Sequence, residues 1–382
     1  MNNIIYLDNN ATTAISPKVQ DTIKQYLDIY GNPSSLHFYG TEVFQDIQKA
    51  REKIARTINA DPEEIIFTSS GSEANNLCIK GYCEANIEKG NHIIISSIEH
   101  PSVINTCKHL EKQGYIVTYL KVDAEGFVNI HDLEKAIKGE TILISVMHVN
   151  NEIGTIQDIE KISEICIKHD IAFHTDAVQS YLKLPIDVKR MNISLASFTG
   201  HKVHAPKGIG FIFKKKGIKI EKQIDGGNQE YNLRAGTENV PYIMGLAEAV
   251  QEFSAIESDS VKSLQKFLFT ELLNIQGVRL NGSGNMEKRI YTNVNVSFEN
   301  LEAEIILQKL SEKGICVSTG SACSSKSTKV SPVLLAIGCP VEYVHGNIRI
   351  SLSKYTTKNE LEYFVATLKD VLASLSQKVF TK

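Results

Sequence analysis

A lysine at the end of a buried strand is the first feature of this sequence that could do chemistry. Residues 193–198 form an apolar run typical of a buried strand, and Lys202 follows shortly after it. Residues 206–213 then predict a turn into another strand. Burial disfavours the ammonium form of a lysine, and a neutral amine can condense with an aldehyde. A lysine in this position can also simply cap the strand or reach water, so Lys202 needs partners before it indicates a function.

Two further segments supply what such a lysine would work with. Asp176 ends the short strand predicted at 171–173, where side chains point into the ligand-binding crevice of an open α/β sheet. Residues 64–67 predict a strand that runs into Gly71 and Ser72 and then a helix, whose free backbone N–H groups suit a phosphate dianion. Pyridoxal phosphate (PLP) requires a lysine for its aldehyde, a carboxylate for its ring nitrogen and a phosphate cradle. Together the three segments predict a PLP site.

The same segments belong to a series of motifs that resembles the cysteine desulfurases. These are the NifS/IscS-like group of the class V aminotransferase-related enzymes of PLP fold type I. Any one motif could arise by chance, but their order and spacing are similar to this family over most of the 382 residues. The motifs are residues 6–13 (YLDNNATT), 31–35 (GNPSS), 99–100 (EH), 148–154 (HVNNEIG), 197–202 (SFTGHK), 234–237 (RAGT) and 318–325 (STGSACSS).

The resemblance implies a role for each candidate side chain. His100 would stack on the pyridine ring and move protons, although by residue type alone it could merely precede a helix. Arg349 lies in an apolar strand and requires an anion partner, either a structural carboxylate or, as the resemblance favours, the substrate α-carboxylate. We therefore predict catalytic roles for Cys323, Lys202 and His100, substrate binding by Asn151 and Arg349, and cofactor binding by Gly71, Ser72, His100, Asn151, Asp176, Gln179, Thr199, His201, Lys202 and Thr237.

Cys323 is the candidate nucleophile. It lies within residues 319–329, which are small, polar and lysine-bearing, and which we expect to form a mobile, solvent-exposed loop. Exposure near Lys326 and Lys329 favours the thiolate, the form of cysteine that attacks sulfur. The small-residue pattern of the segment is similar to the long-loop type of the family.

The remaining cysteines predict no further chemistry. The seven cysteines are odd in number and include no C-x-x-C pair, which argues against a disulfide framework and against a zinc or other metal site. We expect six of them to pack as small apolar side chains. The rivals of Cys323 as nucleophile are Cys316, which we expect to be buried in a strand, and Cys339, which lies beside Pro340 at a turn.

The predicted activity is removal of sulfur from L-cysteine, which gives L-alanine and a persulfide on Cys323. Lys202 would take the Cα proton, and the sulfur would pass to a scaffold protein for iron–sulfur cluster assembly or to another acceptor. The resemblance also implies a homodimer in which Thr237 reaches the phosphate of the neighbouring subunit. The alternatives are a selenocysteine lyase, another PLP-dependent lyase or aminotransferase of this fold, and a non-catalytic sulfur-assembly partner. An exposed cysteine argues against an aminotransferase, and the presence of Lys202 argues against a non-catalytic protein.

The elements that must position these residues alternate between helix and strand. Helices between short apolar strands indicate parallel βαβ units, so we predict an α/β fold with a doubly wound, mostly parallel sheet, similar to the large domain of aspartate aminotransferase. His100, Asn151 and Asp176 each follow a strand, and they should therefore share one crevice. The predicted helices are 72–89, 101–113, 130–138 and 158–169, and the strands are 92–97, 115–121, 141–147 and 171–174.

A second, smaller domain is predicted after residue 253, where this alternation stops. The later elements form a mixed α+β pattern, and in the resembled fold the N-terminal residues join them. We therefore predict a large PLP-binding domain at 16–253 and a small domain made of 1–15 and 254–382, which carries the Cys323 loop. Its predicted helices are 257–275, 301–313 and 357–376, and its strands are 290–298, 315–318 and 346–352.

Composition excludes several other classes of protein. The chain is 42% hydrophobic and 22% charged, as is usual for a globular enzyme. The net charge is −3 and no basic stripe recurs, so nucleic acid is not an expected partner. No apolar window approaches 18 residues, and residues 1–4 lack a charged segment before an apolar one. We therefore expect a cytoplasmic protein with no membrane association.

Overall fold

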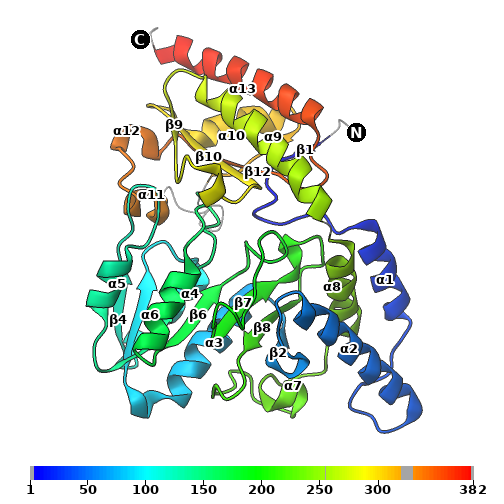
Figure 1. Ribbon diagram of the computed structural model, residues 1–382. Coiled ribbons are helices and arrows are strands. Elements are labelled where there is room, and N and C mark those ends of the chain that lie inside the picture. The colour runs from blue at the N-terminus through cyan, green and yellow to red at the C-terminus, as the bar shows by residue number, and fades with distance from the viewer. Residues whose placement is uncertain (1–3, 254, 320–329, 380–382) are drawn as a thin grey trace.

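A seven-stranded sheet forms the centre of the larger part of the molecule (Figure 1). The computed structural model describes residues 4–253, 255–319 and 330–379. Neighbouring strands are parallel except at β8, which is antiparallel to both β2 and β7. In spatial order the strands are β2 (Ile65–Thr68), β8 (Gly210–Lys214), β7 (Leu195–Thr199), β6 (Ala172–Asp176), β5 (Thr141–Ser145), β3 (His92–Ser96) and β4 (Ile116–Leu120).

Helices cover both faces of this sheet. Successive side chains of a strand point to opposite sides, so an apolar strand gives the sheet two apolar faces that must both be buried. Ile94 packs in one apolar cluster, whereas its neighbours Ile93 and Ile95 pack in another. The fold is therefore the doubly wound, mostly parallel α/β fold that the sequence predicts. One face is covered by α1 (Pro17–Leu27), α2 (Phe38–Arg56), α5 (Ile130–Ala136), α6 (Ile159–Lys168) and α8 (Val240–Glu252), and the other by α3 (Gly71–Ala85) and α4 (Pro101–Glu111).

A three-stranded antiparallel sheet carries the C-terminal elements, with β10 between β9 and β12. A separate parallel pair joins β1 to β11, and Ile5 and Leu7 pack in the same apolar cluster as the helices of this part. The proposed domain bounds at residues 15 and 253 stay a prediction. The elements are β1 (Ile5–Tyr6), α9 (Ala255–Leu273), β9 (Val278–Leu280), β10 (Asn293–Phe298), α10 (Ala303–Glu312), β11 (Ile315–Cys316), β12 (Asn347–Ser351) and α13 (Lys358–Val379).

Short elements differ most from the sequence prediction. The strand predicted at 315–318 ends at Cys316, and Ser318 instead forms an isolated bridge with Arg349. Four elements of three to five residues were not predicted, because a helix of this length shows no repeating apolar face and the strand among them has only three residues. They are α7 (Gln229–Asn232), β9, α11 (Pro332–Ala336) and α12 (Val341–Val344).

The six cysteines within the described ranges are all free, and five of them are buried. The expectation that Cys316 is buried is wrong, because this residue is partly exposed. The physical reason is the size of its sheet: β11 pairs only with β1, and Tyr6, which lies opposite Cys316, is itself 36% exposed. Cys323 lies outside the described residues. No helix of the described part of the chain is long and apolar enough to cross a membrane.

Candidate active site

One cavity of about 840 Å³ gathers most of the predicted site residues. It lies beyond the carboxyl ends of β5, β6 and β7, where a doubly wound sheet presents its loops. Of the predicted residues, Thr237 lines a different cavity, and Cys323 lies outside the described residues. Those that line the large cavity are Gly71, Ser72, His100, Asn151, Asp176, Gln179, Thr199, His201, Lys202 and Arg349.

Lys202 ends the short 3-10 helix (Gly200–Lys202) that follows β7 directly. Its Nζ donates to the backbone oxygens of Asn10 at 2.5 Å and of Ala11 at 2.6 Å. The backbone N–H of Thr13 also donates to the His201 carbonyl at 2.9 Å. The N-terminal segment therefore holds the lysine from across the cavity, a role for Asn10 and Ala11 that the sequence did not predict.

Asp176 is the last residue of β6 and is 4% exposed. Its Oδ1 accepts from the backbone N–H of Val178 at 3.0 Å, and its Oδ2 accepts from Asn75 Nδ2 at 2.7 Å. Hydrogen bonds from two donors stabilise a buried carboxylate. Asn75 is therefore part of the site, although only its place one turn into the helix after the phosphate cradle could have indicated this.

The predicted phosphate cradle lies at the start of α3. Ser70 caps the helix, since its Oγ accepts from the backbone N–H of Glu73 at 3.1 Å. At Gly71 an added Cβ would lie 2.9 Å from Cγ2 of Val178, so the close approach of these two segments requires glycine. The first-turn N–H groups of Gly71 and Ser72 have no partner within a helix, and with the positive end of the dipole they suit a phosphate.

His100 combines the two roles that the sequence left open. It caps α4, because its Nδ1 accepts from the backbone N–H of Ser102 at 3.2 Å, and it lines the cavity. Burial lowers the pKa of His100, and the nearby Lys202 lowers it further while Asp176 opposes the shift. The imidazole is therefore held mainly in its neutral form.

Two residues with amide side chains, Gln179 and Asn151, also line the large cavity. Gln179 Nε2 donates to the backbone oxygen of Asn10 at 3.0 Å, while its Oε1 is buried with no partner among the described residues. A buried polar atom without a partner is costly, and a bound ligand would relieve it. Asn151 contributes its backbone oxygen to Arg349 Nη1 at 3.1 Å and lines the cavity.

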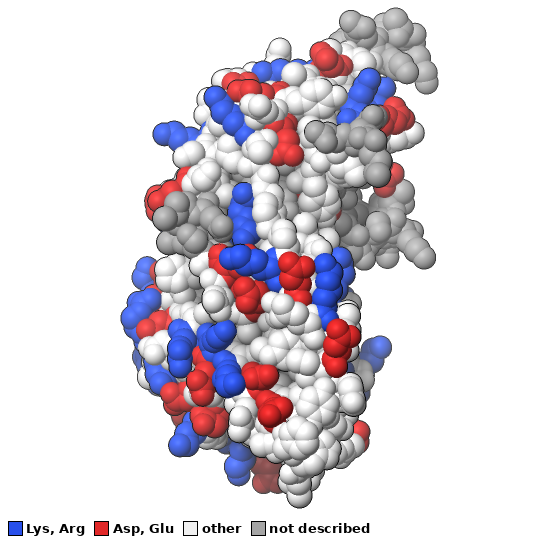
Figure 2. All heavy atoms as spheres, turned by 90° about the vertical axis from the view of Figure 1, so that its right-hand side faces the viewer, with Lys and Arg blue, Asp and Glu red and all other residues white. Residues whose placement is uncertain are grey.

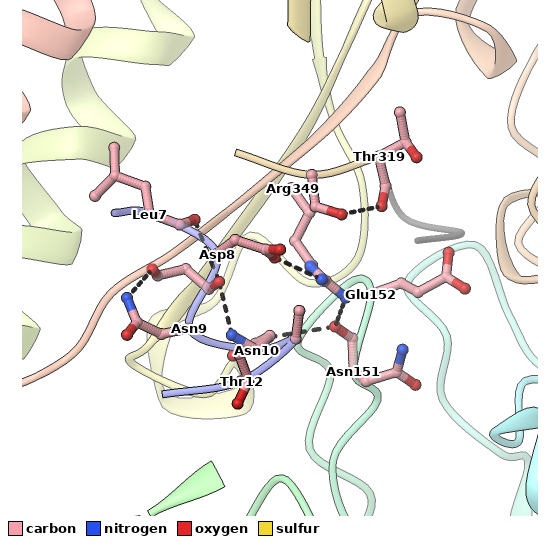
Figure 3. A network of polar contacts seen from close by, with 12 residues as sticks. Leu7, Asp8, Asn9, Asn10, Thr12, Asn151, Glu152, Thr319 and Arg349 are labelled. Atoms are coloured by element: carbon pink, nitrogen blue, oxygen red, sulfur yellow. Dashed lines mark hydrogen bonds and ion pairs between the residues drawn. The ribbon is translucent and has the colours of Figure 1, made fainter. Parts of the chain in front are cut away.

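Arg349 has the structural carboxylate partner that was one of the two predictions for it. Its Nη2 donates to Asp8 Oδ1 at 2.8 Å, and Figure 3 shows Asp8, Asn151 and Arg349 converging from three segments. The Arg349 Nε is buried and has no partner among the described residues. Because Arg349 also lines the cavity, a substrate carboxylate would meet a guanidinium that still has donors to offer.

Glu152 is a further cavity residue that the sequence prediction missed. It lines the cavity, and its Oε2 accepts from the Ser331 hydroxyl at 2.5 Å. Burial raises the pKa of Glu152, while the hydrogen bond from Ser331 and the positive charge of Arg349 oppose the shift. Ser331 caps α11, so this contact attaches the start of that helix to the cavity wall.

Of the remaining predicted residues, His201 and Thr199 line the large cavity and Thr237 lines another one. His201 Nδ1 lies 3.2 Å from Thr12 Oγ1, and burial lowers the pKa of His201 to about 3. Thr199 Oγ1 donates to the Ile209 carbonyl at 3.3 Å. Thr237 lines a separate cavity of about 230 Å³ together with Arg234, and it is not among the described residues that line the main cavity.

These residues fit PLP. A lysine, a buried carboxylate and a glycine-bearing helix start surround one cavity, and the unpartnered Gln179 Oε1 indicates that a polar ligand completes the site. A site of this kind, at the carboxyl ends of a doubly wound sheet, places the protein in the class of PLP-dependent enzymes.

The chain belongs to the aminotransferase class-V family, which matches residues 5–364. It is 46% identical over 377 residues to a protein of Dictyoglomus turgidum named cysteine desulfurase IscS, covering 97% of this chain and 95% of that one. Among solved structures, a NifS-like protein superposes with a TM-score of 0.91 at 36% identity, covering 97% of this chain and 100% of that chain. The structure titled SspA in complex with cysteine gives a TM-score of 0.82 at 39% identity, with coverage of 92% and 100%.

Proposed function

We propose that the protein is a cysteine desulfurase that converts L-cysteine to L-alanine and leaves the sulfur as a persulfide on Cys323. The observation that carries the proposal is that one cavity is lined by Lys202, Asp176 and Arg349, the groups needed for an aldehyde cofactor and an amino-acid carboxylate. The similarity to proteins named cysteine desulfurase and to a structure titled as a complex with cysteine supports L-cysteine as the substrate.

Each residue has a defined task in this proposal. Gly71 and Ser72 bind the cofactor phosphate, and Asp176 holds a proton on the cofactor ring nitrogen, so that PLP, when bound, can accept the electrons released at Cα. Lys202 first holds the cofactor and then moves the Cα proton. Arg349 binds and orients the substrate α-carboxylate.

Sulfur transfer is the task of Cys323. Its thiolate attacks the substrate sulfur, so that an S–S bond forms and the substrate C–S bond breaks. The electron pair of the broken bond returns to the substrate carbon, which takes up a proton and leaves as L-alanine. The outer persulfide sulfur then passes to an acceptor, such as a scaffold protein for iron–sulfur clusters, and we place this transfer in the cytoplasm.

We also propose that the enzyme is a homodimer with shared sites. The segment between α1 and α2 and the first residue of α2 expose large apolar side chains: Leu36 is 99%, Tyr30 87% and Phe38 79% exposed. Part of the lower half of the face in Figure 2 carries no charged side chains. Apolar exposure of this kind is typical of an interface, and a second copy is the partner that the Thr237 prediction requires.

Purified enzyme loaded with PLP provides the test. Incubation with L-cysteine and a reductant should release alanine and sulfide in equal amounts. Parallel incubations with L-selenocysteine and with an amino-group acceptor test whether the protein is instead a selenocysteine lyase or an aminotransferase. Activity on selenocysteine without activity on cysteine would favour a selenocysteine lyase, and transfer of the amino group would favour an aminotransferase.

A further inference from the structure

A chain of hydrogen bonds joins Asp176 to the ring of His100. Asn75 Nδ2 donates to Asp176 Oδ2 at 2.7 Å and to Ser102 Oγ at 2.8 Å. The Ser102 Oγ in turn lies 2.7 Å from His100 Nδ1. All four side chains line the large cavity, so the chain connects two predicted site residues through two residues that the site prediction did not include.

The direction of each hydrogen bond in this chain follows from Asp176. A carboxylate can only accept, so the amide nitrogen of Asn75 must face it, and the same nitrogen then donates to Ser102 Oγ. A serine hydroxyl has one hydrogen. Since Ser102 Oγ accepts from Asn75, its own hydrogen is available for His100 Nδ1, which can accept it with a lone pair.

The backbone of α4 imposes the same requirement. The Ser102 N–H belongs to the first turn of the helix, where no backbone oxygen is available, and it donates to His100 Nδ1 at 3.2 Å. Pro101, at the first helical position, has no N–H. A hydrogen on Nδ1 would face the Ser102 N–H and remove the helix cap.

We propose that Asn75 and Ser102 hold His100 as the neutral tautomer with its hydrogen on Nε2, so that His100 offers the cavity a hydrogen-bond donor and is not the base that takes the substrate proton. No partner of Nε2 is found among the described residues, and His100 lines the cavity. For Nε2 of neutral His100 to accept a proton, the ring hydrogen would first have to move to Nδ1. That move would break the contact with the Ser102 N–H and force the Ser102 hydroxyl hydrogen to turn away from the ring. Asn75 and Ser102 are therefore positioning residues.

The charges around the ring agree with a neutral imidazole. Burial lowers the pKa of His100; Lys202, at the end of the 3-10 helix after β7, adds to this shift, and Asp176, at the end of β6, opposes it. A neutral histidine that donates a hydrogen bond polarises a ligand without taking up a proton. The part of this inference that concerns the reaction rests on the proposed function. In that reaction Lys202 removes the Cα proton.

The tautomer can be measured directly. Holoenzyme labelled with ¹⁵N-histidine gives ring signals in a long-range ¹H–¹⁵N correlation spectrum, and the variant His100→Gln identifies which of them belong to His100. We expect a pyridine-type signal for Nδ1 and a pyrrole-type signal for Nε2 at neutral pH. The reverse pattern, or a doubly protonated ring, would overturn the proposal. An enzyme that fails to release alanine from L-cysteine would contradict the proposed function but would leave this spectrum interpretable.

Matched serine variants test the positioning role. Ser102→Ala removes the hydroxyl donor and keeps the backbone donor, so the fraction of His100 with a hydrogen on Nδ1 should rise about fivefold, as expected for one net hydrogen bond. Ser102→Thr, which keeps a hydroxyl, should give the same spectrum as the wild type. Ser97→Ala is the control, because the Ser97 hydroxyl is buried without a partner among the described residues. An unchanged spectrum in Ser102→Ala, or an equal change in Ser97→Ala, would refute the role of Ser102.

Discussion

Arg349 Nη2 lies 2.8 Å from Asp8 Oδ1, so the guanidinium that we assign to the substrate carboxylate already holds a carboxylate of the protein. The two residues are 341 positions apart in the sequence. Arg349 is 2% exposed, and a buried guanidinium without an anion would be strongly destabilising. Asp8 therefore neutralises Arg349 in the absence of substrate, and it has to share the arginine when substrate binds.

We predict that Asp8→Asn lowers the KM for L-cysteine. The asparagine oxygen keeps the hydrogen bond but no longer offsets the positive charge, so the substrate carboxylate meets less competition. A fall of about fivefold corresponds to about 1 kcal/mol. Steady-state kinetics at low ionic strength measure the change, and Asp21→Asn, which removes an exposed acid, is the control. A KM that stays unchanged or rises at wild-type kcat would show that Asp8 does not compete with substrate.

Lys202→Ala is expected to lower alanine formation by at least about 10²- to 10⁴-fold, the usual contribution of a group that moves a proton in the transition state. PLP can remain bound through its phosphate, but it should no longer be trapped on the protein by borohydride. Lys207→Ala, which removes an exposed lysine on the next turn, should behave as wild type. Borohydride trapping of the cofactor in Lys202→Ala, located by peptide mapping, would contradict the assignment.

His174 should make the enzyme sensitive to acid. Burial lowers the pKa of His174 to about 3, and the Ser145 and Ser197 hydroxyls bond its ring. The unfolded imidazole has a pKa of about 6.5, so the unfolded chain binds more protons below that pH, and the free energy of unfolding falls as pH decreases. His174 alone should account for a loss of about 2 kcal/mol between pH 7 and 5.

Urea unfolding of His174→Gln at these two pH values measures this loss. The variant should show a smaller difference between pH 7 and 5 than the wild type does. His131→Gln removes an exposed histidine and should leave the difference unchanged. An equal difference in His174→Gln and wild type would show that another group causes the acid sensitivity.

Thr237 allows the shared dimer site to be tested by subunit mixing. We expect Thr237→Glu to weaken cofactor binding, because its charge would repel the phosphate in the neighbouring subunit. A heterodimer of Lys202→Ala and Thr237→Glu would contain one site with both native residues. Mixing the two variants under conditions that exchange subunits should therefore recover activity. Formation of heterodimers without any recovery would contradict the shared site.

Cys323→Ser should stop sulfur transfer and leave substrate binding intact. L-cysteine should still perturb the visible spectrum of the cofactor, but alanine formation should fall by at least about 10²-fold because a serine hydroxyl is not ionised at neutral pH. Burial raises the pKa values of the rivals Cys316 and Cys339, which disfavours their thiolates. Mapping of ³⁵S transferred from labelled cysteine identifies the acceptor. A label on Cys316 or Cys339 would place the nucleophile elsewhere.

Hydrophobic periodicity predicted the alternating helices and strands well, because their apolar faces repeat over one or more full turns or pleats. It also placed Asp176 and Lys202 at strand ends, where a doubly wound sheet binds its ligand. The burial of Cys316 was predicted wrongly, since a strand gives no information about the size of the sheet that it joins.

By itself the sequence determined the fold class and predicted which strand ends carry the residue types that a PLP enzyme requires. Only the tertiary structure decided which distant groups meet. Asn10 reaches Lys202, Asp8 reaches Arg349 and Ser331 reaches Glu152, and none of these contacts is implied by spacing along the chain. The physical reason is that local patterns fix dihedral angles and buried faces, whereas hydrogen-bond partners depend on how separate elements pack in three dimensions.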